Sequence, residues 1–481
     1  MQLARLLFPA LRWSAESGFA HETGTIDFAL EKGVGGFIIF GGEAVAVKEL
    51  CAHLRTRSQT PLLIGADLER GAGQQFRGAT QLPPLAALGL LDDLAVTRQA
   101  AALTAREALA VGVNWVLAPV ADLDIEPLNP IIGTRSFGGD PVRVAAHVTA
   151  WIEGCRAEGA LCCVKHFPGH GRTVRDSHET RPIVAADAAA LEADITPFRA
   201  AVIAGTDAVM TAHVAYPSLD RSGAPATLSA PILSRLRQKL GFDGLIVTDA
   251  MIMQGLLDAA GGGAHAAVRA LAAGCDVLLY PSDPAAALEA IENALGRELA
   301  RSRAASAISR VTTATGNAPA GRGQYGRAID TAFSMATAER TIRHIRGDVF
   351  CPREFELLNV DDDLGGPYPP PARDTLVAEL QRVGLEPRVV AGLSGERAAV
   401  AAVYADIRAW KGRPGLSARA IESLEAALAR RPDLLVLLFA HPRLAIDTPG
   451  WNVVCTWGGE AVMQAAAARW LAAETTPRSA A

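Results

Sequence analysis

One short segment of the sequence gathers an unusual number of side chains that can move protons. Residues 165–178 hold three histidines, one of only five lysines in the chain, and Asp176 two positions before His178. At that spacing the carboxylate can accept a hydrogen bond from the imidazole, which fixes the tautomer of the imidazole. Such a histidine can donate a proton to a leaving oxygen and then remove one from water. The segment therefore indicates acid–base chemistry.

Two further interpretations of this segment stay open. One is a solvated loop without chemistry, and the second is a metal site, since histidine and aspartate are both metal ligands. A zinc site usually needs two histidines on one helical face, and Pro168, Gly169 and Gly171 disfavour a regular helix here. The metal interpretation is therefore the weaker one.

A second candidate is Asp249, a lone carboxylate that closes the apolar run Leu245–Asp249. It can cap the helix that follows, or it can act as a nucleophile or general base. A polar residue buried at the end of an apolar strand is unfavourable unless it is paired or functional. Any one such residue can also simply face solvent. Four more residues close apolar runs in the same way: Asp67, Lys165, His166 and His213.

These residues need a scaffold that brings strand ends together. Through residue 281, short runs that are apolar on both faces alternate with Ala-rich, helix-like segments, and several of these end in glycine. Eight alternations predict an α/β fold with a TIM-like (β/α)8 barrel, in which chemistry gathers at the carboxyl ends of the strands. The runs are Arg5–Leu11, Gly36–Phe40, Pro61–Asp67, Trp115–Ala121, Leu161–His166, Ala208–His213, Leu245–Asp249 and Asp276–Pro281.

The alternative scaffold is a doubly wound open sheet. That fold carries a glycine-rich phosphate turn after an early strand, whereas the glycines of residues 33–36 precede one. The chain also lacks the Gly-x-Ser-x-Gly elbow and the phosphate-binding Gly-Lys-Ser/Thr loop. Serine hydrolases, NTPases and dehydrogenases are therefore disfavoured.

The sequence divides into three parts. Residues 1–314 are predicted to form the barrel, and residues 348–481 a smaller α/β domain in which strand-like and helix-like segments alternate. Between them, residues 315–347 combine a linker rich in Gly and Pro with a helical pattern over 332–345. The Pro-rich stretch 366–371 is interpreted as a turn or lid edge.

Composition narrows the class further. Of 481 residues, half are apolar and a fifth charged, and the net charge of −5 comes from interspersed acids and bases. These values indicate a globular chain that binds neither nucleic acid nor membrane. The seven cysteines lack metal-type spacing and are interpreted as reduced and buried. With no signal peptide recognised, we expect a cytoplasmic location.

Residues 165–178, Lys-His-Phe-Pro-Gly-His-Gly-Arg-Thr-Val-Arg-Asp-Ser-His, closely resemble a motif of glycoside hydrolase family 3, in its bacterial β-N-acetylglucosaminidase branch. Supporting matches run along the first 314 residues. They are Gly35–Phe40, Ala118–Asp122, Ile132–Gly138, Gly241–Gly244 and Val247–Met251. Two places depart from the family pattern: Glu69–Gly73 replaces the usual Glu-Gly-Gly, and Ala250 stands where many members have a second Asp.

The resemblance implies roles for the matching residues. Asp249 would be the nucleophile that forms a glycosyl-enzyme, and His178, oriented by Asp176, would be the acid/base. The residues implied to line the sugar pocket are Asp67, Arg135, Lys165, His166 and His213. No metal or organic cofactor is implied, and the implied partner is a small carbohydrate.

The function implied is that of a retaining exo-β-N-acetylglucosaminidase acting on peptidoglycan fragments or chitooligosaccharides. Three alternatives stay open: a β-glucosidase of the same family, a phosphorylase in which phosphate replaces water, and a catalytically silent sugar-binding protein. Oligomeric state is left undetermined by the sequence.

Overall fold

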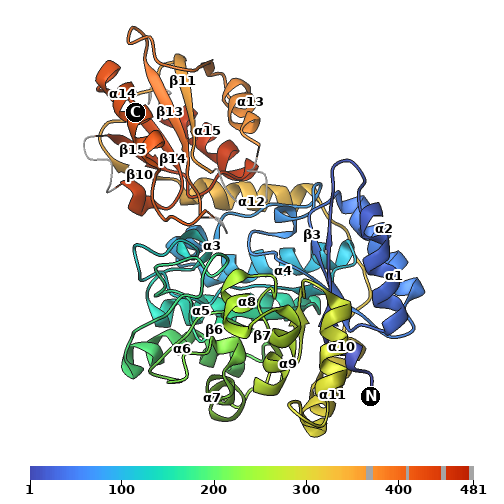
Figure 1. Cartoon of the computed structure of the whole chain (residues 1–481). Coiled ribbons are helices and arrows are strands. Elements are labelled where there is room, and N and C mark those ends of the chain that lie inside the picture. Colours follow the sequence, from blue (N-terminus) through green and yellow to red (C-terminus); the bar gives the residue numbers. More distant parts are fainter. Residues whose placement is uncertain (364–371, 408–410, 446–450, 476–481) are drawn as a thin grey trace. The chain divides into compact units, whose positions relative to one another are not determined.

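The computed structural model describes residues 1–363, 372–407, 411–445 and 451–475 (Figure 1). The Pro-rich stretch 366–371 lies outside the described residues. The chain forms two compact units. The first unit comprises Met1–Thr80, Asp93–Glu126 and Gly138–Arg327, and the second comprises Gln81–Asp92, Pro127–Phe137 and Ala328–Ala481. The boundaries expected at residues 314 and 347 stay predictions.

The first unit is the predicted parallel barrel. Seven strands pair side by side in chain order, from β2 to β8. Closure comes from β1, which pairs in parallel with β9, and from a bridge between Val247 of β8 and Val277 just before β9. The alternative prediction of an open doubly wound sheet is therefore wrong. The strands are β1 (Leu7–Phe8), β2 (Ala10–Arg12), β3 (Gly36–Phe40), β4 (Leu63–Ala66), β5 (Trp115–Val116), β6 (Leu161–Phe167), β7 (Ala208–Thr211), β8 (Leu245–Val247) and β9 (Leu278–Leu279).

Helices of the first unit surround these strands (Figure 1). Their ends follow local chemistry: the Asp140 carboxylate accepts the Arg143 N–H at 2.7 Å to cap α5, and Gly159 ends that helix at a φ of 83°. The main helices are α1 (Thr23–Lys32), α2 (Ala44–Arg57), α4 (Leu94–Ala110), α5 (Pro141–Glu158), α6 (Ala188–Ile203), α8 (Gln254–Ala260), α9 (Gly263–Ala273), α10 (Pro284–Ala294) and α11 (Arg301–Asn317).

The second unit is an α/β sandwich around a six-stranded sheet of order β10-β15-β14-β13-β11-β12. Buried apolar clusters cover both faces of this sheet. The edge strand β10 corrects one expectation: the helix predicted over 332–345 ends at Thr341, and Arg343–Arg346 pairs antiparallel with β15. The elements are α12 (Ala328–Thr341), β10 (Arg343–Arg346), β11 (Glu354–Asp361), α13 (Asp374–Arg382), β12 (Glu386–Val390), β13 (Ala399–Tyr404), α14 (Ala418–Arg430), β14 (Leu435–Phe439), β15 (Asn452–Cys455) and α15 (Ala461–Thr475).

Two further properties concern the whole described chain. All seven cysteines are free and buried, as the sequence predicts. Among the described helices, none combines the length and apolarity that crossing a bilayer requires.

A buried carboxylate, Asp276, lies at the end of the barrel where the strands begin and binds three arginines there. Asp276 is fully buried, accepts the Ile246 N–H at 3.0 Å, and lies 2.7 Å from both Arg237 and Arg303 and 3.3 Å from Arg310. These arginines come from the segment before β8 and from α11. One carboxylate thereby connects three cations that would otherwise repel each other in a partly buried place.

Replacing Asp276 with Asn should therefore destabilise the barrel strongly. We expect a loss of about 3 kcal/mol, because removing one partner of a buried ion cluster leaves uncompensated charge. Differential scanning calorimetry should show a melting temperature several degrees lower. The matched control is Asp27→Asn, which breaks an exposed 2.8 Å pair with Arg57 and should change stability by less than about 1 kcal/mol. Equal melting temperatures for the two variants would contradict this account.

Candidate active site

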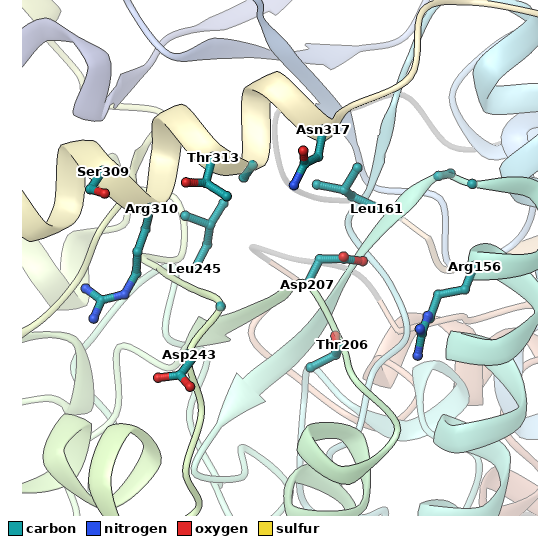
Figure 2. Close-up of a pocket in the computed structure, with 14 residues that line it drawn as sticks. Arg156, Leu161, Thr206, Asp207, Asp243, Leu245, Ser309, Arg310, Thr313 and Asn317 are labelled. Atoms are coloured by element: carbon teal, nitrogen blue, oxygen red, sulfur yellow. The ribbon is translucent and has the colours of Figure 1, made fainter.

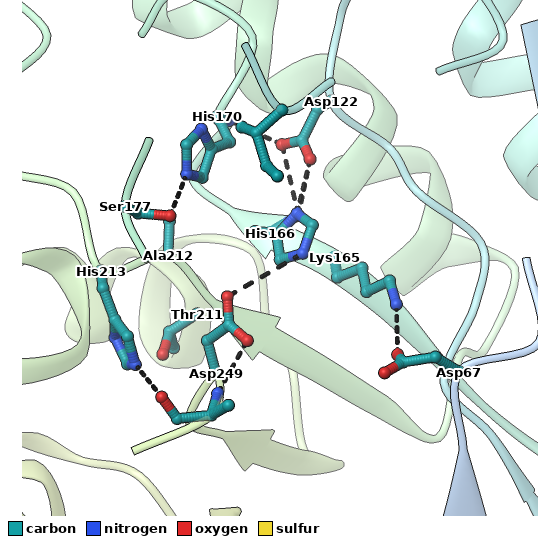
Figure 3. Close-up of polar contacts among 12 residues, drawn as sticks. Asp67, Asp122, Lys165, His166, His170, Ser177, Thr211, Ala212, His213 and Asp249 are labelled. Carbon is teal, nitrogen blue, oxygen red and sulfur yellow. Dashed lines mark hydrogen bonds and ion pairs between the residues drawn. The ribbon is translucent and has the colours of Figure 1, made fainter. Parts of the chain in front are cut away.

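Polar side chains converge at the carboxyl ends of the barrel strands. Asp67 directly follows β4, Lys165 and His166 lie in the last part of β6, and His213 and Asp249 each follow their strand by two residues. Figure 3 shows several of these side chains pointing toward one another. With Asp176 and His178, seven of the eight predicted site residues belong to the first unit.

Asp249 is placed as an ionised carboxylate among histidines. Its Oδ1 accepts the Ala250 N–H at 2.7 Å, and its Oδ2 lies 4.0 Å from His166 Nε2. Burial acts to raise the pKa of Asp249, but His166, His213, His178 and the Ala250 N–H together lower it to about 2. The carboxylate is therefore charged and available as a nucleophile throughout the ordinary pH range.

His213 is fully buried beside Asp249 and is held from both ring nitrogens. Its Nδ1 lies 2.7 Å from Thr227 Oγ1, and its Nε2 lies 3.2 Å from the Ala250 carbonyl, which can only accept. The Nε2 therefore carries a proton. Burial lowers the pKa of His213, so the ring supports the backbone next to Asp249 mainly as a neutral donor.

Lys165 is buried between two carboxylates. Its Nζ lies 2.6 Å from Asp67 Oδ1 and 2.7 Å from Glu69 Oε1. The Asp67 side chain is 29% exposed, whereas those of Lys165 and Glu69 are nearly fully buried. Asp67 is thus the most exposed member of this group, and Lys165 fixes its direction.

Asp176 and His178 form the hydrogen-bonded pair that their spacing predicts. The Asp176 Oδ1 lies 2.7 Å from His178 Nδ1 and also accepts the His178 backbone N–H at 2.9 Å. The Asp176 carboxylate is fully buried, and the imidazole is 17% exposed. With Nδ1 bonded to the carboxylate, Nε2 is the nitrogen that can exchange a proton with a ligand.

Asp122 also lies at the carboxyl ends of the barrel strands, which are called the rim below. It is absent from the predicted set, although it follows the apolar run Trp115–Ala121 just as the predicted residues follow theirs. It is fully buried, and its Oδ2 lies 2.7 Å from His166 Nδ1. Burial raises the pKa of Asp122, but His166 and His170 lower it more, so the net shift is downward. No comparable sequence signal indicates that Glu69 contacts Lys165 or that the Ser177 hydroxyl contacts the His170 ring.

The eighth predicted residue, Arg135, lies in the second unit. It ends the short helix Gly133–Arg135, and its Nη1 donates to the Ile131 carbonyl at 3.0 Å. The preceding Thr134 Oγ1 donates to Asp406 Oδ1 at 2.7 Å. The role of Arg135 toward a ligand stays a prediction.

A hollow of about 580 Å³ lies at the other end of the barrel (Figure 2). It is lined by the first residues of β6 and β8, Leu161 and Leu245, together with Asp207 and part of α11. Among the described residues that line it, none is a predicted site residue. In the described part of the chain, no group of three or more potential metal ligands is arranged to hold an ion.

A parallel barrel with polar side chains gathered at the carboxyl ends of its strands is the arrangement of an enzyme active site. Residues 18–314 match the model of the glycosyl hydrolase family 3 N-terminal domain, and the chain belongs to this family. It is a glycoside hydrolase.

Individual relatives support the assignment. The chain is 39% identical over 273 residues to a beta-hexosaminidase of Thiobacillus denitrificans, a match that covers 54% of this chain and 74% of that protein. It is 34% identical over 258 residues to a beta-N-acetylglucosaminidase/beta-glucosidase of Cellulomonas fimi, covering 51% of this chain but under half, 46%, of that protein. A solved family 3 beta-N-acetylglucosaminidase of Paenibacillus sp. strain FPU-7 is 27% identical with a TM-score of 0.85, covering 99% and 96% of the two chains.

The low pKa of Asp249 leads to a test by pH. His166→Gln removes the strongest of the influences that lower this pKa, so the pKa should rise toward its ordinary value. Because a carboxylate can act as a nucleophile only in its ionised form, we expect the variant to lose kcat/KM at a higher pH than the wild type as acid is added. The measurement is the pH dependence of aryl-glycoside hydrolysis. His265→Gln, at an exposed position on α9, is the control and should leave the profile unchanged.

Proposed function

We propose that the protein is a retaining exo-β-N-acetylglucosaminidase that removes terminal N-acetylglucosamine from peptidoglycan fragments or chitooligosaccharides. One observation carries the proposal: an ionised carboxylate, Asp249, shares a strand-end rim with a carboxylate–imidazole pair, Asp176–His178. The influence of His178 on the Asp249 pKa supports their proximity. The relatives named for hexosaminidase activity support the choice of sugar.

The first step is attack by an Asp249 oxygen on C1 of the sugar. The bond from C1 to the leaving oxygen breaks as the ester forms, and His178 Nε2 gives its proton to that oxygen. Asp176 remains ionised and stabilises the imidazolium before this transfer. The transition state carries oxocarbenium character, which the nearby Asp249 charge favours.

The second step reverses these roles. His178, now neutral, takes a proton from a water molecule as the water oxygen attacks C1, and the ester bond to Asp249 breaks. Two inversions at C1 leave the product with the configuration of the substrate. Asp67 and Lys165 would bind hydroxyls of the sugar, with His166 and His213 completing the pocket. Arg135 keeps the sugar-binding role that the family resemblance implies.

A histidine in place of a second carboxylate has one chemical consequence, which concerns the attacking group. A lone anion beside the ester would repel an anionic attacker, whereas the Asp176–His178 pair does not add a second lone carboxylate there. Phosphate could then replace water and release a sugar 1-phosphate. A β-glucosidase of the same family also stays open as the activity, whereas membership of the glycoside hydrolase family disfavours the silent sugar-binding protein.

A place in cell-wall recycling inside the cell is the physiological role that we propose for this activity. It rests on the family resemblance of residues 165–178 and on the sugar specificity above. Peptidoglycan fragments carry the terminal sugar that such an enzyme would release.

Comparing two aryl glycosides tests the specificity. The purified protein should hydrolyse the β-N-acetylglucosaminide much faster than the β-glucoside, with no dependence on phosphate. A rate that requires phosphate and yields sugar 1-phosphate would identify a phosphorylase. Preference for the glucoside would contradict the proposed sugar, and turnover of neither compound would contradict the proposed activity on simple aryl glycosides and indicate a requirement for a larger aglycone.

Replacing Asp249 with Ala tests the nucleophile. We expect kcat/KM to fall at least ~10⁴-fold, the order of loss seen when a nucleophile is removed from a catalytic group. The matched control is Asp243→Ala, because Asp243 precedes the same strand, is exposed, and lines the hollow at the opposite end of the barrel. The control should keep wild-type activity, and full activity of the Asp249 variant would refute the assignment.

A further inference from the structure

A single buried carboxylate connects two histidines of the β6 segment. Asp122 Oδ1 accepts the backbone N–H of His170 at 2.6 Å, while both its oxygens lie 3.2 Å from the backbone nitrogen of His166 and Oδ2 reaches the His166 ring. Figure 3 shows the rings of His166 and His170 near this carboxylate. The main chain that carries the His170 side chain is therefore fixed in position.

The ring of His170 makes two hydroxyl contacts within the β6–α6 loop (residues 168–187). Its Nδ1 lies 2.9 Å from Thr173 Oγ1, and its Nε2 lies 2.9 Å from Ser177 Oγ. His170 is 2% exposed and Ser177 is 1% exposed. Two buried polar groups that meet at this distance hold each other firmly, because breaking the contact leaves both without water.

The direction of these hydrogen bonds follows from the acceptors. The Thr173 hydroxyl donates to the His170 carbonyl at 3.1 Å, since a carbonyl only accepts. Its oxygen then accepts the Nδ1–H of His170. Burial lowers the pKa of His170 to about 4, so at neutral pH the ring is neutral and its Nε2 accepts the proton of Ser177.

Ser177 stands between the two members of the acid–base pair, Asp176 and His178. The other side of the loop packs against the start of α8. There a Cβ on Gly255 would lie 3.0 Å from the Ser177 carbonyl and closer still to that of Thr180. The Gln254 N–H donates to the His178 carbonyl at 3.2 Å. The residue pair is thus held from two sides, by the His170 ring and by α8.

We propose that His170 is a positioning residue for the catalytic acid/base. Acting through Ser177, it aims the His178 imidazole at the leaving oxygen, and Asp122 fixes His170 in turn. The inference rests on the proposed function, because it assumes that His178 transfers the proton. It assigns His170 no contact with the substrate and no change of protonation state.

Leaving-group dependence distinguishes positioning of the acid from general stability. A dinitrophenolate leaves without protonation, whereas a phenol of high pKa needs the proton from His178. We expect Ser177→Ala and His170→Phe to lower kcat/KM about tenfold for aryl β-N-acetylglucosaminides with poor leaving groups. For the dinitrophenyl compound they should lower it less than twofold. Ser177→Thr, which keeps the hydroxyl, should restore most of the lost rate.

Three measurements complete the experiment. His178→Ala should show the same dependence with a larger loss, and Ser309→Ala, an exposed serine of α11, should behave as wild type. An equal loss for all leaving groups in Ser177→Ala and His170→Phe, or no loss in either, would overturn the positioning role. If His178→Ala itself lacks leaving-group dependence, then the proposed acid/base is wrong and the inference fails with it. Melting temperatures confirm that each variant is folded.

Discussion

A carboxylate that is buried away from water must accept hydrogen bonds from the protein. Asp122 meets this requirement by binding main-chain N–H groups and an imidazole near the carboxyl end of β6. It accepts two backbone N–H groups and contacts one imidazole, all from the short stretch that joins β6 to its loop. The alternative, an ionised group buried among apolar strands, would be several kcal/mol less favourable. The direction of His166, and through it the surroundings of Asp249, depends on this one buried group.

The histidines of the rim have different roles because their surroundings differ. His178 is partly exposed and bonded to a carboxylate, which suits it to proton transfer. His170 and His213 are fully enclosed and meet mainly hydroxyl and carbonyl groups, and burial lowers the pKa of both. Enclosed imidazoles of this kind act as rigid connectors, because burial disfavours their charged form and both ring nitrogens are held by neighbouring groups.

The barrel could be predicted because its strands are buried on both faces, so that each appears as a short apolar run closed by a polar residue. The Asp176–His178 pair could be predicted because its members are two residues apart. The partners of Asp122 are 44 and 48 residues away, and no local pattern indicates such a pairing. Strand β10 escapes prediction because it is mostly polar, with the sequence Arg-His-Ile-Arg, and lies at a sheet edge, where an apolar run is not needed.

The division of the chain into compact units has a consequence for how such a protein can be rearranged. The segments Gln81–Asp92 and Pro127–Phe137 are encoded within the barrel but belong to the second unit. A single crossover between genes would therefore separate parts of one hydrophobic core. Exchanging the second unit for that of a relative requires three coordinated replacements, so the two units are inherited together more readily than domains joined by one linker.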